Sequence, residues 1–393
     1  MNLYKIESFL VKFMPKISVI IPCYNVEDFV EECLDSVINQ TFEDMEIICI
    51  NDGSTDNTLS ILESYAKRDD RIKILNQNNQ GLSASRNRAL EMAKGEYIFF
   101  LDSDDYIELT TFEELIRLAE EKCLDLIIFN LRNFDNETKE EQYDKYYDMP
   151  FLKEIVGDNV FNYKDLGYKM LILSVTAPGK LFKREIIQDL RFPVGLIFED
   201  NPFFTEVMFK AKRVFFLDEQ FYNRRVHLNS ITNSSTDKFS DWIEISNILF
   251  DILKKYDYFE VCKKAAYFKK FYGSYKFLTL VDETEKKDFF ERIKKDFASH
   301  KDDYESIKGN FRYKRKLDLI LNSALEFDSH EEFELTVRNY EITAKNNRLK
   351  KRNDELKKEI KEYEKINKTI LNSTSWKITK PSRQITNFFR NFK

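Results

Sequence analysis

The chain has 393 residues, more than one hydrophobic core usually serves, so we expect two domains and an appended segment. With 62 Lys and Arg against 68 Asp and Glu, its net charge of −6 argues against a nucleic-acid-binding function based on overall charge. Five scattered cysteines without C-x-x-C spacing indicate neither a disulfide framework nor a zinc site, and fit a reducing cytosol. No apolar run is long enough to span a membrane and the first residues lack a signal-peptide core, so we expect the protein to stay inside the cell.

Apolar runs typical of central strands alternate with helical periodicity in the first third of the chain. The runs lie at 17–21, 46–50, 71–75, 97–101 and 124–129. Apolar residues at i, i+3, i+4 spacing over 29–38 and 59–66 predict amphipathic crossover helices. This alternation predicts an α/β fold with a largely parallel sheet.

Polar sequences follow four of these strands, where a parallel sheet binds its ligands. They are "PCYN" (22–25), "NDGS" (51–54), "NNQG" (78–81) and "DSDD" (102–105). In "DSDD", Asp102 and Asp104 lie on one side of an extended chain, and hard oxygen ligands suit Mg²⁺ or Mn²⁺. Such an ion also takes phosphate ligands, so a diphosphate is expected beside it. The alternative is a solvated loop that caps the following helix.

The order and spacing of "ISVIIPCYN", "EIICINDGSTDNT", "NNQGLSASRNRAL" and "GEYIFFLDSDD" resemble family 2 nucleotide-sugar glycosyltransferases of the GT-A fold. The resemblance is dense over residues 16–130 and extends more thinly to about 235. It implies a Rossmann-like, mixed and largely parallel sheet with flanking helices. It also implies an inverting transfer, dependent on Mn²⁺ or Mg²⁺, of a sugar from a nucleotide diphosphate donor, usually a UDP-sugar, to a hydroxyl group.

The resemblance assigns the donor nucleotide to residues that match the family's motifs, namely Pro22, Tyr24, Asp52, Asn79, Arg86 and Asp102. The Asp52 carboxylate would accept the uracil N–H, and Tyr24 would stack on the base. Asp104 would bind the metal, and Asp105 would support the donor sugar or the metal site. Alternatively, Asp52 caps the helix that begins near Asn57.

A transferase also needs a base that removes the acceptor proton. "GLIFEDNPFF" (195–204) matches the family's Glu-Asp motif, which puts Asp200 in that role and lets Glu199 support it. Because adjacent carboxylates disfavour simultaneous ionisation, the pKa of one of them should rise. Asp200 can also cap a helix ahead of Pro202, and the two roles can coexist.

"FYNRRVHLNSIT" (221–232) matches a grouping that closes over the diphosphate in this family. His227 would complete the metal shell or bind a phosphate oxygen, with a purely structural histidine as the alternative. Arg224 or Arg225 offers a bidentate fork, and the sequence does not choose between them. Ser230 would support this site. "TAPGKLFKRE" (176–185) departs from many relatives at Pro178 and Gly179, so the sequence leaves the acceptor side open.

The sequence after residue 235 predicts mainly helices. We assign 1–235 to the GT-A domain, with a nucleotide-binding half (16–130) and an acceptor half (131–235), and 236–336 to a helical extension. Its many aromatic residues indicate a core, with a sugar-binding groove as the alternative. Over 337–372, a heptad seam recurs at Ile342, Leu349, Leu356, Tyr363 and Ile370, with Asn346, Asn353, Ile360 and Asn367 at the second seam position. This predicts a coiled coil and a parallel homodimer, or alternatively a helix folded back on its own enzyme.

The last segment, 373–393, mixes aromatic and basic residues, which fits either an anionic membrane surface or docking on a partner subunit. The sequence therefore predicts a cytoplasmic glycosyltransferase, peripheral on the inner face of the membrane. Its acceptor would be a hydroxyl of a surface polysaccharide, glycolipid or teichoic-acid-like polymer, without nucleic acid as a partner. A sugar nucleotidyltransferase and a noncatalytic coiled-coil scaffold are the alternatives.

Overall fold

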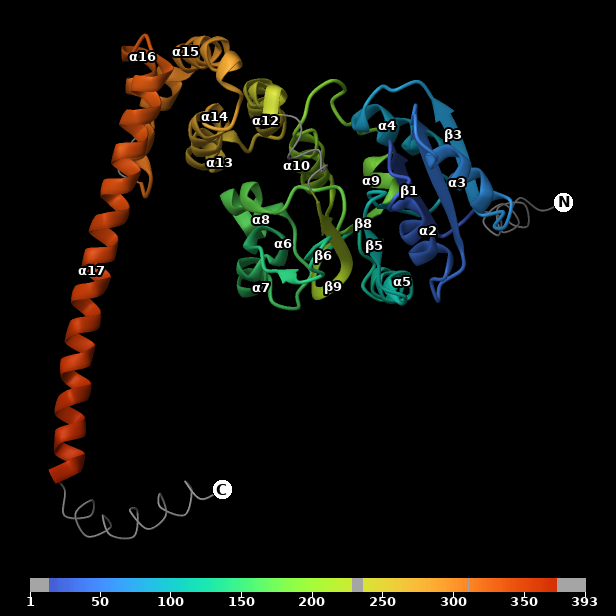
Figure 1. Ribbon diagram of the computed structural model, residues 1–393, viewed down its shortest axis with the longest axis horizontal. Coiled ribbons are helices and arrows are strands. Elements are labelled where there is room, and N and C mark those ends of the chain that lie inside the picture. Colours follow the sequence, from blue (N-terminus) through green and yellow to red (C-terminus); the bar gives the residue numbers. More distant parts are fainter. Residues whose placement is uncertain (1–13, 228–235, 308, 310, 373–393) are drawn as a thin grey trace. The chain divides into compact units, whose positions relative to one another are not determined.

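The computed structural model describes residues 14–227, 236–307, 309 and 311–372, and Figure 1 shows the order of its helices and strands. Contact density divides the described chain into two compact units, one ending at Leu325 and one beginning at Glu326. The first unit holds the sheet and the candidate site. The second consists mainly of one long helix.

A mixed sheet organises the first unit, with strand order β3-β2-β1-β4-β8-β6-β9-β5 and β7 paired to β6. Its strands are β1 (Ile17–Cys23), β2 (Met45–Asp52), β3 (Ile72–Gln77), β4 (Tyr97–Phe100), β5 (Tyr106–Ile107), β6 (Leu126–Asp135), β7 (Glu141–Gln142), β8 (Lys180–Lys183) and β9 (Val214–Val226). β1 pairs in parallel with β2 and β4, β2 with β3, and β6 with β9, whereas β8 runs antiparallel to β4 and β6. The five predicted strands are thus present in a largely parallel sheet, but β3, which was expected to be central, lies at the edge of the sheet.

Helices cover both faces of this sheet, which explains why β1 and β2 are buried along their whole length. Among the described residues, the helices up to the last strand are α2 (Val30–Ile38), α3 (Thr58–Ala66), α4 (Leu82–Met92), α5 (Thr111–Glu121), α6 (Lys145–Asp148), α7 (Pro150–Val156), α8 (Tyr163–Leu166), η1 (Gly167–Ile172), α9 (Arg184–Ile187) and α10 (Asp200–Lys210). The two predicted crossover helices correspond to α2 and α3.

Neighbouring phenylalanines of β4 show how the two faces are filled. Phe99 packs edge-on against Phe112 of α5, with ring centroids 5.1 Å apart. Phe100 points to the opposite face, where it packs edge-on against Phe182 and Phe192. This alternation follows from the two-residue period of a strand, and it fixes the direction in which β4 delivers the residues after it.

The helical region that follows the sheet has an aromatic core, as expected from its sequence. It comprises η2 (Thr236–Asp241), α12 (Trp242–Lys255), α13 (Phe259–Tyr267), the π-helical turn η3 (Phe268–Tyr272), α14 (Gly273–Leu278), α15 (Glu283–Glu305) and α16 (Lys314–Glu326). Trp242, Phe250, Tyr267 and Phe271 are all buried. The long helix of the second unit is α17 (His330–Asn372). In the part of the chain that the structure describes, no helix has the length and apolar character needed to cross a bilayer.

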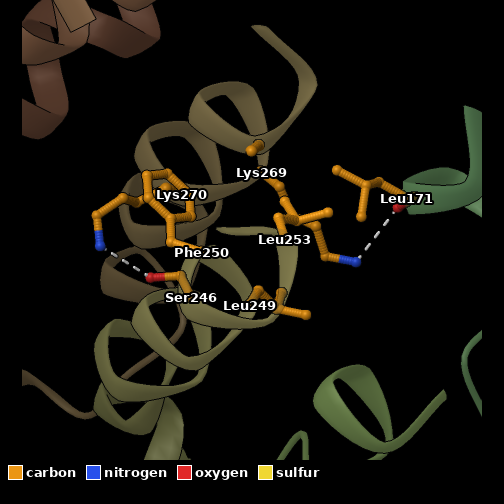
Figure 2. A pocket seen from close by; sticks show the side chains of 8 residues that line it. Leu171, Ser246, Leu249, Phe250, Leu253, Lys269 and Lys270 are labelled. Carbon is orange, nitrogen blue, oxygen red and sulfur yellow. Dashed lines mark hydrogen bonds between the residues drawn. The ribbon is translucent and has the colours of Figure 1, made fainter. Parts of the chain in front are cut away.

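A small cavity lies between α12 and the residues of α13 and η3 (Figure 2). Leu249 and Phe250 line it together with the partly buried Lys269 and the buried Lys270. Lys269 donates to the carbonyl oxygen of Leu171, and Lys270 donates to the hydroxyl of Ser246. The accessible space is only about 10 Å³, which holds roughly one water molecule. The cavity is therefore too small for a sugar nucleotide.

Candidate active site

The carboxyl ends of the parallel strands meet at one edge of the sheet, and Asp52 joins two of the loops found there. Its Oδ1 accepts from the Gln77 side chain at 2.8 Å and from the Gln80 backbone N–H at 2.9 Å. Its Oδ2 accepts from the Gly81 backbone N–H at 2.8 Å. Asp52 does not cap α3, because Asp56 accepts from the first N–H of that helix, on Thr58, at 3.0 Å.

Gly53 allows the loop after β2 to lie directly against the loop after β3. Its φ is +74°, and a Cβ built there would lie 2.7 Å from the backbone nitrogen of Asn79. Any other residue would therefore be strained and would push the loops apart. At the end of β1, Pro22 is buried, whereas Tyr24 is half exposed. The residues expected to hold the nucleoside thus share one edge of the sheet.

Arg86 of α4 lies at the centre of the site and connects two carboxylate motifs. Its Nη2 donates to Asp102 Oδ1 at 2.9 Å. Its Nη1 donates to Glu199 Oε1 at 2.9 Å and to Asp200 Oδ1 at 3.1 Å. The side chain is 2% exposed, and its guanidinium lies over the Phe192 ring, 5.3 Å from the ring centroid. The buried guanidinium of Arg86 therefore offsets the negative charge of carboxylates that come from distant parts of the sequence.

Glu199 and Asp200 stand at the start of α10, where a helix favours negative charge. Burial raises the pKa of Glu199 to about 7, and the neighbouring Asp200 carboxylate adds to this effect against the opposing charge of Arg86. Of the adjacent pair, Glu199 is thus the carboxyl whose proton affinity is raised towards neutrality. Burial also raises the pKa of Asp102, although Arg86 opposes this.

Asp105 anchors the acidic loop to β9. Its Oδ1 accepts from the backbone N–H of Arg225 at 2.7 Å, and its Oδ2 accepts from the Tyr222 hydroxyl at 2.7 Å. The same hydroxyl accepts from the backbone N–H of Asp102 at 3.1 Å. Burial, followed by the charges of Asp104 and Asp102, raises the pKa of Asp105 well above its ordinary value. Asp105 therefore fixes the conformation of the loop by binding it to β9.

The two arginines of β9 differ in how strongly they are held. Arg225 is 3% exposed and donates to the carbonyl oxygen of Asp104 at 2.8 Å, to Asn136 at 2.7 Å and to Glu32. Arg224 donates to Asn133 at a longer 3.3 Å. Its guanidinium also lies 5.0 Å from the centroid of the Tyr147 ring. The Arg225 guanidinium thus already has three partners, one of them in the acidic loop, and Arg224 has the weaker polar contacts.

Asp104 and His227 form the pair that best fits a divalent cation. His227 Nε2 lies 2.9 Å from Asp104 Oδ2, and the two side chains are 12% and 27% exposed. Adjacent ligands of an octahedral ion, each about 2.1 Å from it, lie about 3 Å apart, so the spacing of these two atoms is suitable. Within the described ranges, no third His, Cys, Asp or Glu joins this pair at ligand distance. Other ligands would have to supply the remaining positions. Ser230, also expected here, lies outside the described residues.

The departure at "TAPGK" has a structural explanation in this chain. Gly179 has a φ of +77°, and a Cβ there would lie 2.3 Å from Cδ1 of Leu131, next to the irregular pairing of β6 with β9. The following Lys180 is buried and donates to the carbonyl oxygen of Thr176, with its ammonium 4.6 Å from the centroid of the Phe204 ring. Burial lowers the pKa of Lys180 to about 7, while the charge of Asp200 opposes this shift.

Sequence reasoning missed several residues that hold the site together, chiefly Tyr222, Gln77 and Glu32. Tyr222 stands in a strand rich in buried residues, and a buried tyrosine usually needs a partner for its hydroxyl. That signal was available within "FYNRRVH", although it did not identify the partner. Gln77 and Glu32 carry no comparable signal, because their partners lie on other elements.

Comparisons with known proteins bear on the family and the fold of this chain. The sequence model described as glycosyl transferase family 2 matches residues 18–191. Glycosyltransferase GlyA of Streptococcus pneumoniae serotype 4 is 35% identical over 229 residues, which make up 57% of this chain and 32% of GlyA. Glycosyltransferase GlyG of the same organism is 31% identical over 224 residues, 56% of this chain and 74% of GlyG.

Among solved structures, the crystal structure of S. aureus TarS 1-349 in complex with UDP has a TM-score of 0.62 and 21% sequence identity, covering 84% of this chain and 92% of that one. This likeness confirms the fold class expected from the sequence. The chain spans about a third of the length of GlyA.

Proposed function

We propose, from the premise that this chain belongs to glycosyl transferase family 2 and has the GT-A fold, that it transfers a sugar from a nucleotide diphosphate donor to an acceptor hydroxyl with inversion. The family expected from the sequence motifs is confirmed by these comparisons, whereas the donor, the acceptor and the metal dependence belong to the proposal. The main support for this proposal is that the guanidinium of Arg86 donates to both Asp102 and Asp200. Donor-side and acceptor-side groups of the proposed reaction thus share one site.

The donor nucleoside would lie along the loops that Asp52 and Gly53 hold together. Tyr24 offers an exposed ring for stacking on the base. Because Asp52 already accepts three hydrogen bonds, it would mainly act by shaping the 78–81 loop. UDP, which the TarS structure contains, is the first nucleotide to test.

The diphosphate would lie next to Asp104 and His227, which would hold a Mn²⁺ or Mg²⁺ ion. When bound, that ion would neutralise charge on the departing diphosphate. Of the two arginines, we assign Arg224 to the phosphate, because the Arg225 guanidinium already donates to the Asp104 carbonyl, to Asn136 and to Glu32. A guanidinium fork suits a phosphate group.

Asp200 would take the proton from the acceptor hydroxyl as its oxygen bonds to the sugar and the bond from the sugar to the diphosphate breaks. A single displacement of this kind inverts the configuration at the sugar carbon. Arg86 lies 3.1 Å from Asp200 and would orient the carboxylate for this transfer. Glu199, whose pKa burial raises to about 7, would carry a proton in part near neutral pH and so reduce the negative charge beside Arg86.

The test is a panel of nucleotide sugars with Mn²⁺, Mg²⁺ or a chelator, monitored for released nucleoside diphosphate. We expect one donor to be consumed in a metal-dependent way. Asp200→Asn should abolish transfer to an acceptor and still bind the nucleotide, and Asp189→Asn, the same change at an exposed residue, serves as a control. A chain that binds no nucleotide sugar and releases no diphosphate would be the noncatalytic scaffold instead. Release of inorganic pyrophosphate from a nucleoside triphosphate would indicate a nucleotidyltransferase.

We further propose that the acceptor is a surface glycan, a glycolipid or a teichoic-acid-like polymer at the inner face of the membrane. The basic and aromatic residues of 373–393, which lie outside the described structure, support this location only through their sequence. Co-sedimentation of the full chain with anionic liposomes at low salt tests it. Recovery of all the protein in the supernatant would remove the membrane from the proposal.

A further inference from the structure

Helix α17 carries a row of exposed apolar side chains that nothing in its own unit covers. Ile342, Leu349, Leu356 and Tyr363 recur every seven residues and are 48%, 58%, 40% and 68% exposed, and Ile360 lies between them at 56%. A helix of 43 residues with such a stripe gains stability by burying it against another helix. The seven-residue period is the geometry of a coiled coil, with these four residues at the position named d.

The other seam position, named a, identifies the partner. It is occupied by Asn346, Asn353, Ile360 and Asn367. In a parallel pair that is in register, each asparagine faces the same asparagine of a second copy, so the two amides can exchange hydrogen bonds. In an antiparallel pair, the asparagines would face d residues such as Leu349, and each buried amide without a partner weakens an association about tenfold or more.

The single isoleucine in this series also fixes the register. If one helix slides by seven residues, the Ile360 of each chain faces an asparagine of the other chain instead of the other Ile360. Two amides are then buried against isoleucine, and the isoleucine pair is lost. The in-register arrangement is thus the one in which every a layer is self-complementary.

The flanking positions behave differently from those of an ordinary coiled-coil dimer. In the parallel pair, Lys345 would face Lys350 of the second copy, and Arg352 would face Lys357. Glu359 would face Glu364 in the same manner, so all three contacts join like charges. Each contact occurs twice in a dimer, and exposed charge pairs have small individual effects, so together they weaken the dimer by of order 30-fold at low salt (about 2 kcal/mol).

The last heptad reverses this trend. Its flanking residues, Ile366 and Leu371, are apolar and are 47% and 52% exposed. They would face each other across the same parallel pair and widen the apolar seam. The seam therefore supplies the affinity, and the charges reduce it.

We propose that α17 binds the α17 of a second copy of this chain, parallel and in register, and that this dimer tightens as the salt concentration rises. The Debye length falls from about 10 Å at 0.1 M to about 3 Å at 1 M, so salt screens the repulsion between the flanking charges. An ordinary coiled coil with attractive flanking pairs loosens under the same change. The proposal does not depend on the enzymatic activity.

Sedimentation of the full-length chain from 0.05 to 1 M NaCl measures the salt response. We expect the dimer dissociation constant to fall by of order 10- to 30-fold as salt rises. The double variant Lys345→Glu, Arg352→Glu turns four repulsive contacts into attractive ones, so it should dimerise more tightly at low salt and lose the salt response. The matched control Lys351→Glu, Lys358→Glu makes the same charge change on the outer face of the helix and should keep the parental response.

Orientation is tested by Leu349→Cys in a Cys123→Ser background, because Cys123 is the exposed native thiol among the described cysteines. A parallel, in-register dimer places the two introduced thiols opposite each other, so oxidation should link the full-length chains covalently. A monomer at every salt concentration, a dimer that loosens with salt, or a dimer without this crosslink would each overturn the proposal.

Discussion

Replacing Glu199 with glutamine should remove a defined pH dependence from the stability of this protein. The native state raises the pKa of Glu199 from its ordinary value of 4.5 to about 7, mainly through burial. Between these two values the native state holds a proton that the unfolded chain has lost. The free energy of unfolding therefore falls as pH rises through this window.

The size of the effect follows from the two pKa values. At about 1.4 kcal/mol for each pH unit, the difference between 4.5 and about 7 amounts to about 3 kcal/mol. Glutamine is close in shape to the protonated side chain, and its amide oxygen can still accept from Arg86. The variant should hence match the parent near pH 4.5 and become more stable than the parent, by up to about 3 kcal/mol, at pH 7 and above.

The assay is thermal unfolding of parent and variant between pH 4.5 and 8. Subtracting the two curves cancels groups that titrate identically in both proteins. Glu91→Gln is the matched control, because Glu91 is a half-exposed residue of α4 whose ion pair with Arg88 lies at the surface. Its difference curve should be flat within about 1 kcal/mol. A flat difference curve for Glu199→Gln as well would refute the raised pKa, and with it the idea that this carboxyl holds a proton near neutral pH.

Two further changes address the acidic loop. Asp104→Asn should abolish metal-stimulated release of nucleoside diphosphate, because an amide is a poorer ligand than a carboxylate for a hard cation. Its melting temperature should stay near that of the parent. If the variant keeps the parental turnover with Mn²⁺ or Mg²⁺, Asp104 is not a metal ligand. Tyr222→Phe should lower the free energy of unfolding by about 1–3 kcal/mol, because it removes the hydroxyl that joins Asp105 to the Asp102 backbone. Unchanged unfolding of that variant in denaturant would mean that the hydroxyl contributes nothing to the anchor.

The sheet and the positions of its acidic motifs were predictable because local signals carry them. Runs such as 17–21 and 97–101 are strongly apolar and short, and they lie between segments of clear helical period. Once parallel strands are assigned, the position of "DSDD" at the ligand-binding edge follows from topology alone. A raised pKa in the Glu199 and Asp200 pair was also predicted from the adjacent charges, although burial, which the sequence does not give, is the larger cause at Glu199.

The hydrogen bonds and ion pairs between the side chains of the site were not predictable in the same way. The sequence assigned Arg86 to the donor, but the structure shows its guanidinium bound to Asp102 and to two residues more than 100 positions further along the chain. Such partners are set by how the second half packs against the first, and no period or local motif encodes that. The choice between Arg224 and Arg225 also depended on Glu32, which lies 193 positions from Arg225.

Three aspartates can lie close together at this edge of the sheet because each of them has a different partner. Asp102 shares Arg86 with the acidic pair of α10, while Asp105 accepts from the Tyr222 hydroxyl and a backbone N–H, and burial raises its pKa well above the ordinary value, which favours the uncharged carboxyl. Asp104 alone of the three is left facing a histidine, which is uncharged in one of its two forms. The negative charge available to a cation is therefore concentrated at Asp104, at the position where a diphosphate would bring more. Under the proposed function, a divalent ion would thus bind tightly only together with the donor, and metal binding would be coupled to donor binding.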